Sequence, residues 1–95
     1  MAAYIVATVR IHDPDKFAEY ATAVAGMNER YGGEPLVRGA VEEVLEGDGM
    51  VGERVVVSRF ATAEAAKAYI LSAEYQAVRA KRKGAAEVVM RLVIG

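Results

Sequence analysis

The spacing of apolar residues changes repeatedly along the chain, and these changes constrain the fold most strongly. Residues 4–11 are rich in β-branched and aromatic residues and lack glycine and proline, which predicts a strand. From Pro14 onward, apolar side chains recur at steps of three and four, which predicts a helix. Asp13 can cap this helix, and we expect it to end near Tyr31, because two glycines follow.

An extended pattern resumes at residues 36–46. Gly39 interrupts this pattern, and an isolated glycine within a strand predicts a kink or bulge. The glycine-rich segment 47–52 predicts a turn, and residues 54–60 predict a third strand. Together these segments predict an antiparallel hairpin.

The remaining third of the chain is predicted to be two short helices and a last strand. Thr62 and Ser72 are suitable N-caps for helices over residues 63–70 and 73–83. Residues 87–94 return to a strand pattern. The order strand, helix, strand, strand, helix, strand predicts an α+β chain of the ferredoxin-like βαββαβ type, with helices on one face of an antiparallel sheet.

The length of 95 residues fits one domain, residues 1–95. One set of alternating side chains on the first and last strands suits a core beneath the helices. The other set, which includes Tyr4, Val6, Val89 and Val93, is mixed rather than polar. We therefore expect a second copy of the chain to cover that face, as a homodimer.

Composition and charge narrow the classes of function. Hydrophobic residues make up 54% of the chain and charged residues 26%, which predicts a folded protein. The net charge of −1 disfavours binding to nucleic acid or to an anionic membrane. The chain has no cysteine, which excludes disulfides and thiolate sites. The first apolar run ends at Arg10, too early for a signal peptide or a spanning helix, so we expect a cytoplasmic protein.

Several short motifs, taken in their order and spacing, resemble a family catalogued as domain of unknown function 1330 (DUF1330). They are Tyr4, Asp13, Tyr20, YGG at 31–33, LVRG at 36–39, LEG at 45–47, RVVV at 54–57, Phe60, SAEYQ at 72–76 and Arg79. The resemblance covers nearly the whole chain and implies a subunit of the dimeric α+β barrel group, in which pockets lie between sheet and helices. It implies no settled activity.

The sequence departs from that family pattern at three positions. Arg59 stands where the family tends to have a glutamate, Tyr69 where a tryptophan is common, and Ala40 in place of a second glycine. The inverted charge at Arg59 argues against an acidic site at that end of the strand.

Motifs for metals and cofactors are missing. His12 is the only histidine, and one imidazole among scattered carboxylates makes a poor metal site. Its position before a helix cap favours an exposed or capping role over that of a general base or haem ligand. No phosphate loop or dinucleotide fingerprint is present, so neither a metal nor a cofactor is expected. The basic run 79–83 is typical of cations at a helix C-terminus.

Arg38 is the leading candidate for a ligand contact. The planar fork of arginine suits a carboxylate or an enolate oxygen held by two parallel hydrogen bonds. The alternative is an ion pair with Glu46, Glu43 or Glu34. Glu46 is itself a candidate acid or base, provided that burial raises its pKa.

Other polar residues extend this candidate set. Tyr31, Tyr20 and Tyr75 could each direct a hydroxyl into a pocket, or they could be core rings whose tips reach water. Arg54 and Arg59 alternate on one strand, so one of them is expected to face the helices and the other the partner sheet.

Two functions remain open from the sequence. The first is a small-molecule pocket, selective for anions, in a cofactor-free oxygenase or isomerase that uses Arg38 and a tyrosine. The second is a non-catalytic dimeric module for ligand sensing or protein interaction. The lack of a recognisable catalytic set leaves open whether the protein is an enzyme.

Overall fold

The computed structural model describes residues 1–95 and contains four strands and four α-helices. The strands are β1 (Ala3–Ile11), β2 (Glu34–Ala40), β3 (Arg54–Phe60) and β4 (Ala86–Ile94). The helices are α1 (Pro14–Val24), α2 (Met27–Arg30), α3 (Ala63–Leu71) and α4 (Ala73–Arg79), and a short 3₁₀ helix, η1 (Ala80–Arg82), follows α4. The predicted α+β order of elements is confirmed.

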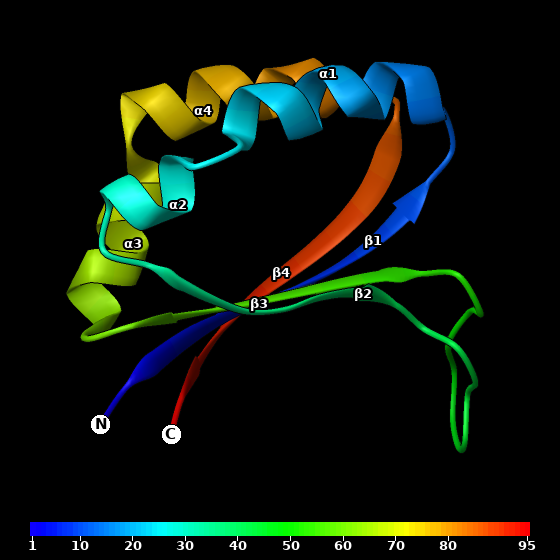
Figure 1. Cartoon of the computed structure of the whole chain (residues 1–95), viewed down its shortest axis with the longest axis horizontal. Coiled ribbons are helices and arrows are strands. Elements are labelled where there is room, and N and C mark those ends of the chain that lie inside the picture. The colour runs from blue at the N-terminus through cyan, green and yellow to red at the C-terminus, as the bar shows by residue number, and fades with distance from the viewer.

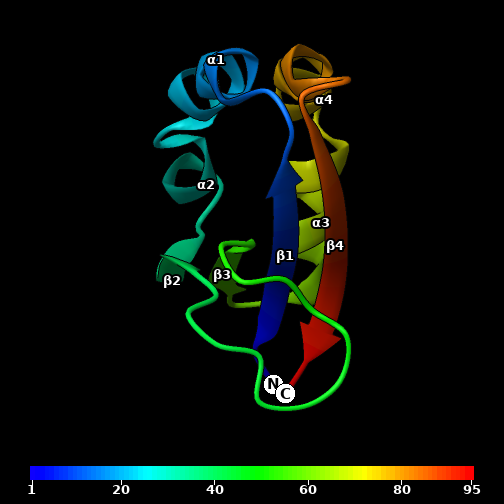
Figure 2. The ribbon, with the colours of Figure 1, turned by 90° about the vertical axis from the view of Figure 1, so that its right-hand side faces the viewer.

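The four strands form one antiparallel sheet in the order β2-β3-β1-β4. All helices lie on one side of this sheet (Figure 1). Seen from the side, α1 and α4 lie next to each other above the strands, and the two termini lie together at the opposite end (Figure 2). This is the ferredoxin-like arrangement predicted from the sequence.

The pairing register decides which side chains face the helices. Ile5 on β1 lies opposite Ser58 on β3 and Leu92 on β4, so these three share the helix-covered face. A compact aromatic cluster closes the core near α3 and α4, where Phe60 and Tyr75 are almost fully buried. Burial of such rings is a large part of the stabilisation available to a chain of this size.

The first helical segment is broken, although the sequence predicted one continuous helix. Gly26 adopts the left-handed conformation, with φ 76°, and separates α1 from α2. The turn carries Met27 and Asn28 into the core, whereas α1 has no buried residue. None of the helices is long and apolar enough to cross a membrane.

The hairpin also differs from the prediction. Gly39 pairs regularly with Val55, and the irregularity in the β2–β3 ladder lies between Pro35 and Val37 instead. Proline has no N–H group to donate to a ladder, which explains a bulge at that point. The predicted kink at Gly39 is therefore wrong.

The connection between β2 and β3 is longer than the predicted turn. Residues 41–53 leave the sheet, and backbone hydrogen bonds of Val41 with Glu53 and Gly52 close the base of this excursion. The excursion extends to the side of the sheet that lacks helices (Figure 1). Its side chains are largely exposed, including Leu45 at 87%.

Candidate functional site

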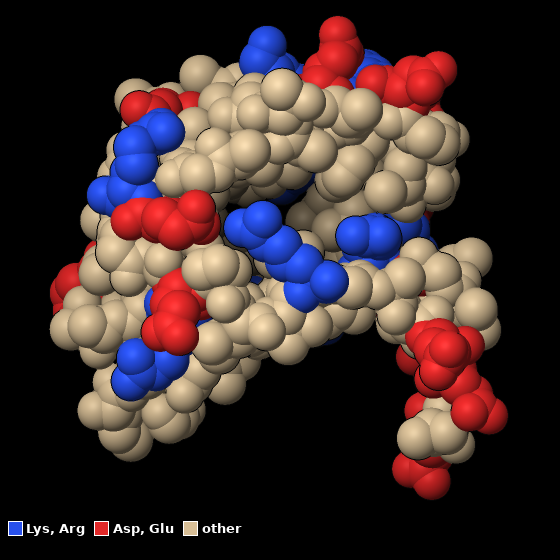
Figure 3. Space-filling model, viewed as in Figure 1, with Lys and Arg blue, Asp and Glu red and all other residues tan.

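The space beneath α1 is not filled by side chains. The apolar face of α1 looks toward the sheet, but a cavity of about 260 Å³ remains between them, and we call it the α1 cavity. Phe17, Tyr20 and Val24 form its roof, and Ala7 and Val9 lie on its floor. Figure 3 shows the hollow between the helical layer and the sheet, with basic side chains along its edge.

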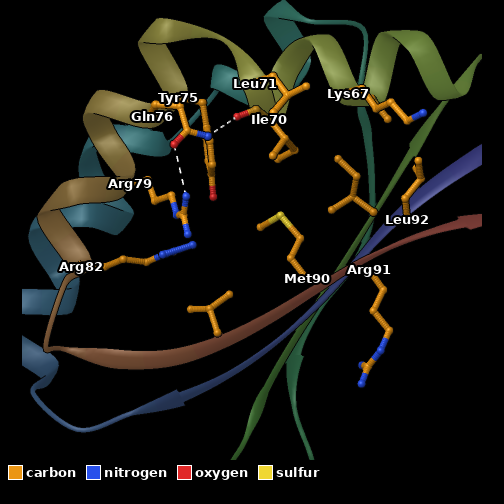
Figure 4. Close-up of a pocket in the computed structure, with 13 residues that line it drawn as sticks. Lys67, Ile70, Leu71, Tyr75, Gln76, Arg79, Arg82, Met90, Arg91 and Leu92 are labelled. Atoms are coloured by element: carbon orange, nitrogen blue, oxygen red, sulfur yellow. Dashed lines mark hydrogen bonds between the residues drawn. The ribbon is translucent and has the colours of Figure 1, made fainter.

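A second cavity, of about 560 Å³, lies between α3, α4 and β4, and we call it the α4 cavity (Figure 4). Residues that line both cavities are Ile5, Ile70, Tyr75, Arg82, Val88 and Met90. The two cavities therefore adjoin across one set of side chains. The α4 cavity falls within the range of volumes usual for small-molecule sites, and the α1 cavity lies just below it.

The charged residues that line the cavities are all cationic. Arg38, Arg54 and Arg82 line the α1 cavity, and Lys67, Arg79, Arg82 and Arg91 line the α4 cavity. No carboxylate lines either one, although the chain has 13 acidic and 12 basic residues. Of these cations only Arg38 forms an ion pair, so the cavities carry positive charge that the chain does not neutralise.

Two tyrosine hydroxyls meet inside the α1 cavity. The Tyr20 and Tyr75 hydroxyl oxygens lie 3.0 Å apart, so one of the hydroxyls donates a hydrogen bond to the other. A hydroxyl has a single proton, and the pair therefore keeps one proton free for a further acceptor. A ligand oxygen in the cavity could accept it.

Burial makes two of the cavity tyrosines harder to ionise. Burial, reinforced by Tyr75, raises the pKa of Tyr20 well above its ordinary value, and Arg82 opposes the shift only in part. Burial also raises the pKa of Tyr69 to about 12, with smaller effects of Tyr75 and Glu29 in the same direction. These phenols are hydrogen-bond donors rather than bases at neutral pH.

Arg82 is turned inward from the end of the α4–η1 segment. Its guanidinium carbon lies 5.1 Å from the centre of the Tyr20 ring, which is a cation–π contact. Its Nε atom is buried and has no hydrogen-bond partner. A buried donor without a partner is unfavourable, and an anionic ligand in either cavity would relieve this.

Asn28 is held at the inner wall of the α1 cavity. Its Nδ2 atom donates a 2.9 Å hydrogen bond to Ser58 Oγ, while Oδ1 is buried and has no partner. Gly33 packs against this amide so closely that a Cβ atom there would lie 1.9 Å from Oδ1. Only glycine fits this position without movement of Asn28.

Three of the residues predicted from the sequence lie together at the α1 cavity: Arg38, Arg54 and Tyr20. Arg38 forms its ion pair with Glu29, at 3.6 Å, and with none of the three glutamates named from the sequence. Arg54 faces the helices, whereas Arg59 lies on the uncovered face opposite Tyr4.

The other three predicted residues lie outside both cavities. Glu46 is exposed in the excursion 41–53. His12 is exposed at the end of β1, with Nε2 3.7 Å from Glu87 Oε1. Tyr31 packs against the Tyr69 ring, with ring centres 5.3 Å apart. Their roles as ligand contacts stay predictions from the sequence.

Sequence reasoning missed Arg82 and Asn28 as residues of the cavities. A signal for Arg82 was available, because Arg79 and Arg82 are three residues apart and so share a helix face, whereas Lys81 does not. No signal pointed to Asn28, since its burial depends on the turn at Gly26.

The sheet order and the helices on one face define a ferredoxin-like α+β fold, with cavities between the two layers. The chain belongs to the family described as "Domain of unknown function (DUF1330)", whose model matches residues 2–95. The resemblance found in the sequence motifs is thereby confirmed.

Solved structures with the same fold include proteins of several descriptions. A protein of unknown function from Rhodopseudomonas palustris is 21% identical, with a TM-score of 0.72 over 97% of this chain and 80% of that one. SnoaB, a cofactor-independent oxygenase from Streptomyces nogalater, is 12% identical, with a TM-score of 0.70 over 99% and 92%. A dimeric ferredoxin-like protein of unknown function from Thermobifida fusca YX is 18% identical, with a TM-score of 0.68 over 100% and 92%. At these identities the likeness establishes the fold. No curated protein sequence matches the chain.

Proposed function

We propose that this protein is a homodimer that binds a small organic anion in the α1 cavity, with the apolar part of the ligand between α1 and the sheet. The observation that carries the proposal is the charge of the lining. Its charged side chains are all arginines, and Arg54 and Arg82 have no ion-pair partner. An anion is the ligand that such a lining stabilises best.

Arg38 is suited to bind the ligand at the exposed part of the α1 cavity, and we call it the outer anchor. Its side chain is 55% exposed, and its contact with Glu29 is a long ion pair at the surface. Such pairs stabilise a protein by only about 0 to 1 kcal/mol, so Arg38 can exchange Glu29 for a ligand carboxylate at little cost. The free proton of the Tyr20–Tyr75 pair then serves a second oxygen of the ligand, deeper in the cavity.

The lining supplies donors but no acidic or imidazole base. No aspartate, glutamate or histidine lines either cavity, so no such group is placed to take a proton from a ligand. This favours binding without chemistry, as in a ligand sensor. The description of SnoaB as a cofactor-independent oxygenase supports the alternative that this protein catalyses a reaction. Such a reaction would need a ligand that reacts once the hydrogen-bond donors of the cavity hold it.

The dimer is proposed to form through the face of the sheet that lacks helices. Val37, Val89 and Val93 on this face are 48%, 47% and 44% exposed. A patch of this kind favours a protein partner, and the description of the Thermobifida fusca neighbour as dimeric supports a second copy of the chain.

A comparison of matched acids and neutral analogues tests the binding proposal. Thermal shift would be measured with a panel of small aromatic and aliphatic carboxylates and with their methyl esters. We expect the acids, and not the esters, to raise the melting temperature, because only the acids engage the arginines. Any acid that binds would then be incubated with the protein in air. Turnover of the acid would indicate an enzyme, and binding without turnover would indicate a ligand sensor.

Arg38→Gln should weaken the response to these acids and leave the melting temperature of the free protein nearly unchanged. Lys81→Gln removes an exposed cation outside both cavities and is the matched control. Equal shifts with acids and esters, or equal losses in the two variants, would contradict an anion site at Arg38.

A further inference from the structure

We propose that Arg79 and Arg82 form a second oxyanion site, in the α4 cavity, which holds the carboxylate or phosphate end of an apolar ligand. Arg38 and Arg54 line the α1 cavity but not the α4 cavity. The second site therefore does not include Arg38, the outer anchor of the α1 cavity, although the two cavities share Arg82.

Residues three apart on a helix lie on the same face, and Arg79 and Arg82 both line this cavity. Figure 4 shows the two guanidinium groups directed into the cavity, toward the end of Tyr75. Two like charges on one face repel each other unless an anion lies between them, and the structure places no carboxylate there.

Arg79 is held in place by the side-chain amide of Gln76. Gln76 Nε2 donates a 2.7 Å hydrogen bond to the Ile70 carbonyl oxygen, which fixes the orientation of the amide. Gln76 Oε1 then accepts a 3.2 Å hydrogen bond from Arg79 Nη1. The contact uses one of the five N–H donors of Arg79 and orients the others, so Gln76 is a positioning residue.

Arg79 and Arg82 differ from the other cations at this helix end, because both line the α4 cavity. The same basic run contains Lys81 and Lys83, which line neither cavity, whereas Arg79, although exposed as they are, lines the α4 cavity. A general preference for positive charge at a helix C-terminus explains these lysines. It does not explain why Arg82 turns inward and buries an Nε atom without a partner.

The cavity also defines the body of the ligand. Ile70, Leu71, Met90 and Leu92 supply an apolar wall next to the two arginines. At about 560 Å³ the cavity has room for a short hydrocarbon or aromatic group in addition to one oxyanion. A chain of several carbons that ends in a carboxylate or a phosphate matches this lining.

Titration with hexanoate, hexyl phosphate and hexanol, followed by amide NMR spectra of the isotope-labelled protein, tests the proposal. We expect both anions to shift resonances of α4 and β4 and to bind at least roughly ten-fold more tightly than hexanol, because charge-assisted hydrogen bonds add to the apolar contact. The tighter of the two anions identifies carboxylate or phosphate as the preferred end group. Equal affinity for hexanol and the two anions would overturn the proposal.

Variants locate the site. Arg79→Gln should weaken the binding of the anions roughly ten-fold and leave hexanol binding unchanged, whereas Lys81→Gln should change neither. Arg38→Gln should also leave this binding intact, so failure of the α1 cavity proposal and failure of this one give different results. Arg82→Lys keeps the charge without the planar fork and should weaken binding in a chain that remains folded. Equal losses in Arg79→Gln and Lys81→Gln would show attraction to surface charge alone and overturn the proposal.

Discussion

At the scale of single residues, the cavities depend on polar groups that the fold buries without complete partners. The guanidinium group of Arg82 packs on the face of Tyr20, and its buried Nε atom has no acceptor. The Tyr20–Tyr75 pair likewise has one proton more than it uses internally. Groups of this kind reduce stability in the free protein, and a ligand that supplies the acceptor recovers the loss.

The raised pKa of Tyr69 predicts sensitivity to alkali. Because the folded state favours the neutral phenol, the stabilisation is fully present below the unfolded tyrosine pKa of about 10. It is lost as the pH rises from there toward the folded pKa of about 12. We expect the free energy of unfolding, measured by urea denaturation, to fall across this window in the native protein.

Tyr69→Phe removes the titrating group, and no side-chain hydrogen bond of the Tyr69 hydroxyl is lost with it. The variant should therefore match the native protein near neutral pH and lose less stability above pH about 10. The difference between the two curves isolates Tyr69 from the lysines that titrate in the same range. Parallel curves throughout the alkaline range would show that Tyr69 ionises as easily in the folded state as in the unfolded state.

At the scale of elements, the break at Gly26 determines the site. The break changes the direction of the chain, so that Met27 and Asn28 of α2 enter the core, whereas α1 lies above the α1 cavity. Gly26→Ala forces a residue with a side chain to adopt φ 76°, and we expect it to lose about 1 to 2 kcal/mol of stability. Urea denaturation measures this loss.

Asparagine at the same position is the informative control. Asparagine tolerates the left-handed conformation better than alanine, although its side chain is larger. Gly26→Asn should therefore be the more stable of the two variants. The opposite order would show that crowding, and not backbone conformation, limits this position.

Most elements could be predicted from the sequence because their signals are local. Asp13, Thr62 and Ser72 each accept a hydrogen bond from a backbone N–H three residues later, as their position before a helix predicted. The turn at Gly26 was missed because the apolar stripe continues through it. The bulge beside Pro35 was assigned to Gly39 because the strand was predicted to begin at residue 36, which left Pro35 outside it.

At the scale of the whole molecule, the net charge of the chain gives no indication that the cavities are lined with positive charge. The chain is nearly neutral, yet its acidic residues lie outside the cavities and its inward-facing charges are cationic. The sequence predicted Arg38 as a candidate because its planar fork suits an oxyanion, and strand alternation predicted that either Arg54 or Arg59 would face the helices. The spacing of Arg79 and Arg82 indicates a shared helix face, but whether that face turns toward the cavities depends on how α4 packs against α1.

The last prediction concerns assembly through the uncovered face of the sheet. Val57 and Val6 pair at the middle of this face, and both are half-buried in the single chain. A second copy that covers them should give a mass of about twice the chain mass of 10.2 kDa in light scattering at micromolar concentration. Val57→Lys would place a charge in the proposed interface and should return the mass of one chain with the secondary structure retained.

Ala68→Lys adds the same charge on the exposed surface of α3 and should leave the dimer intact. The comparison separates a specific interface from general repulsion between chains of changed net charge. A native protein with the mass of one chain would refute the dimer outright. A dimer that survives Val57→Lys would place the interface elsewhere, on the helices or the excursion 41–53, and the exposed valines of the sheet would then need another partner.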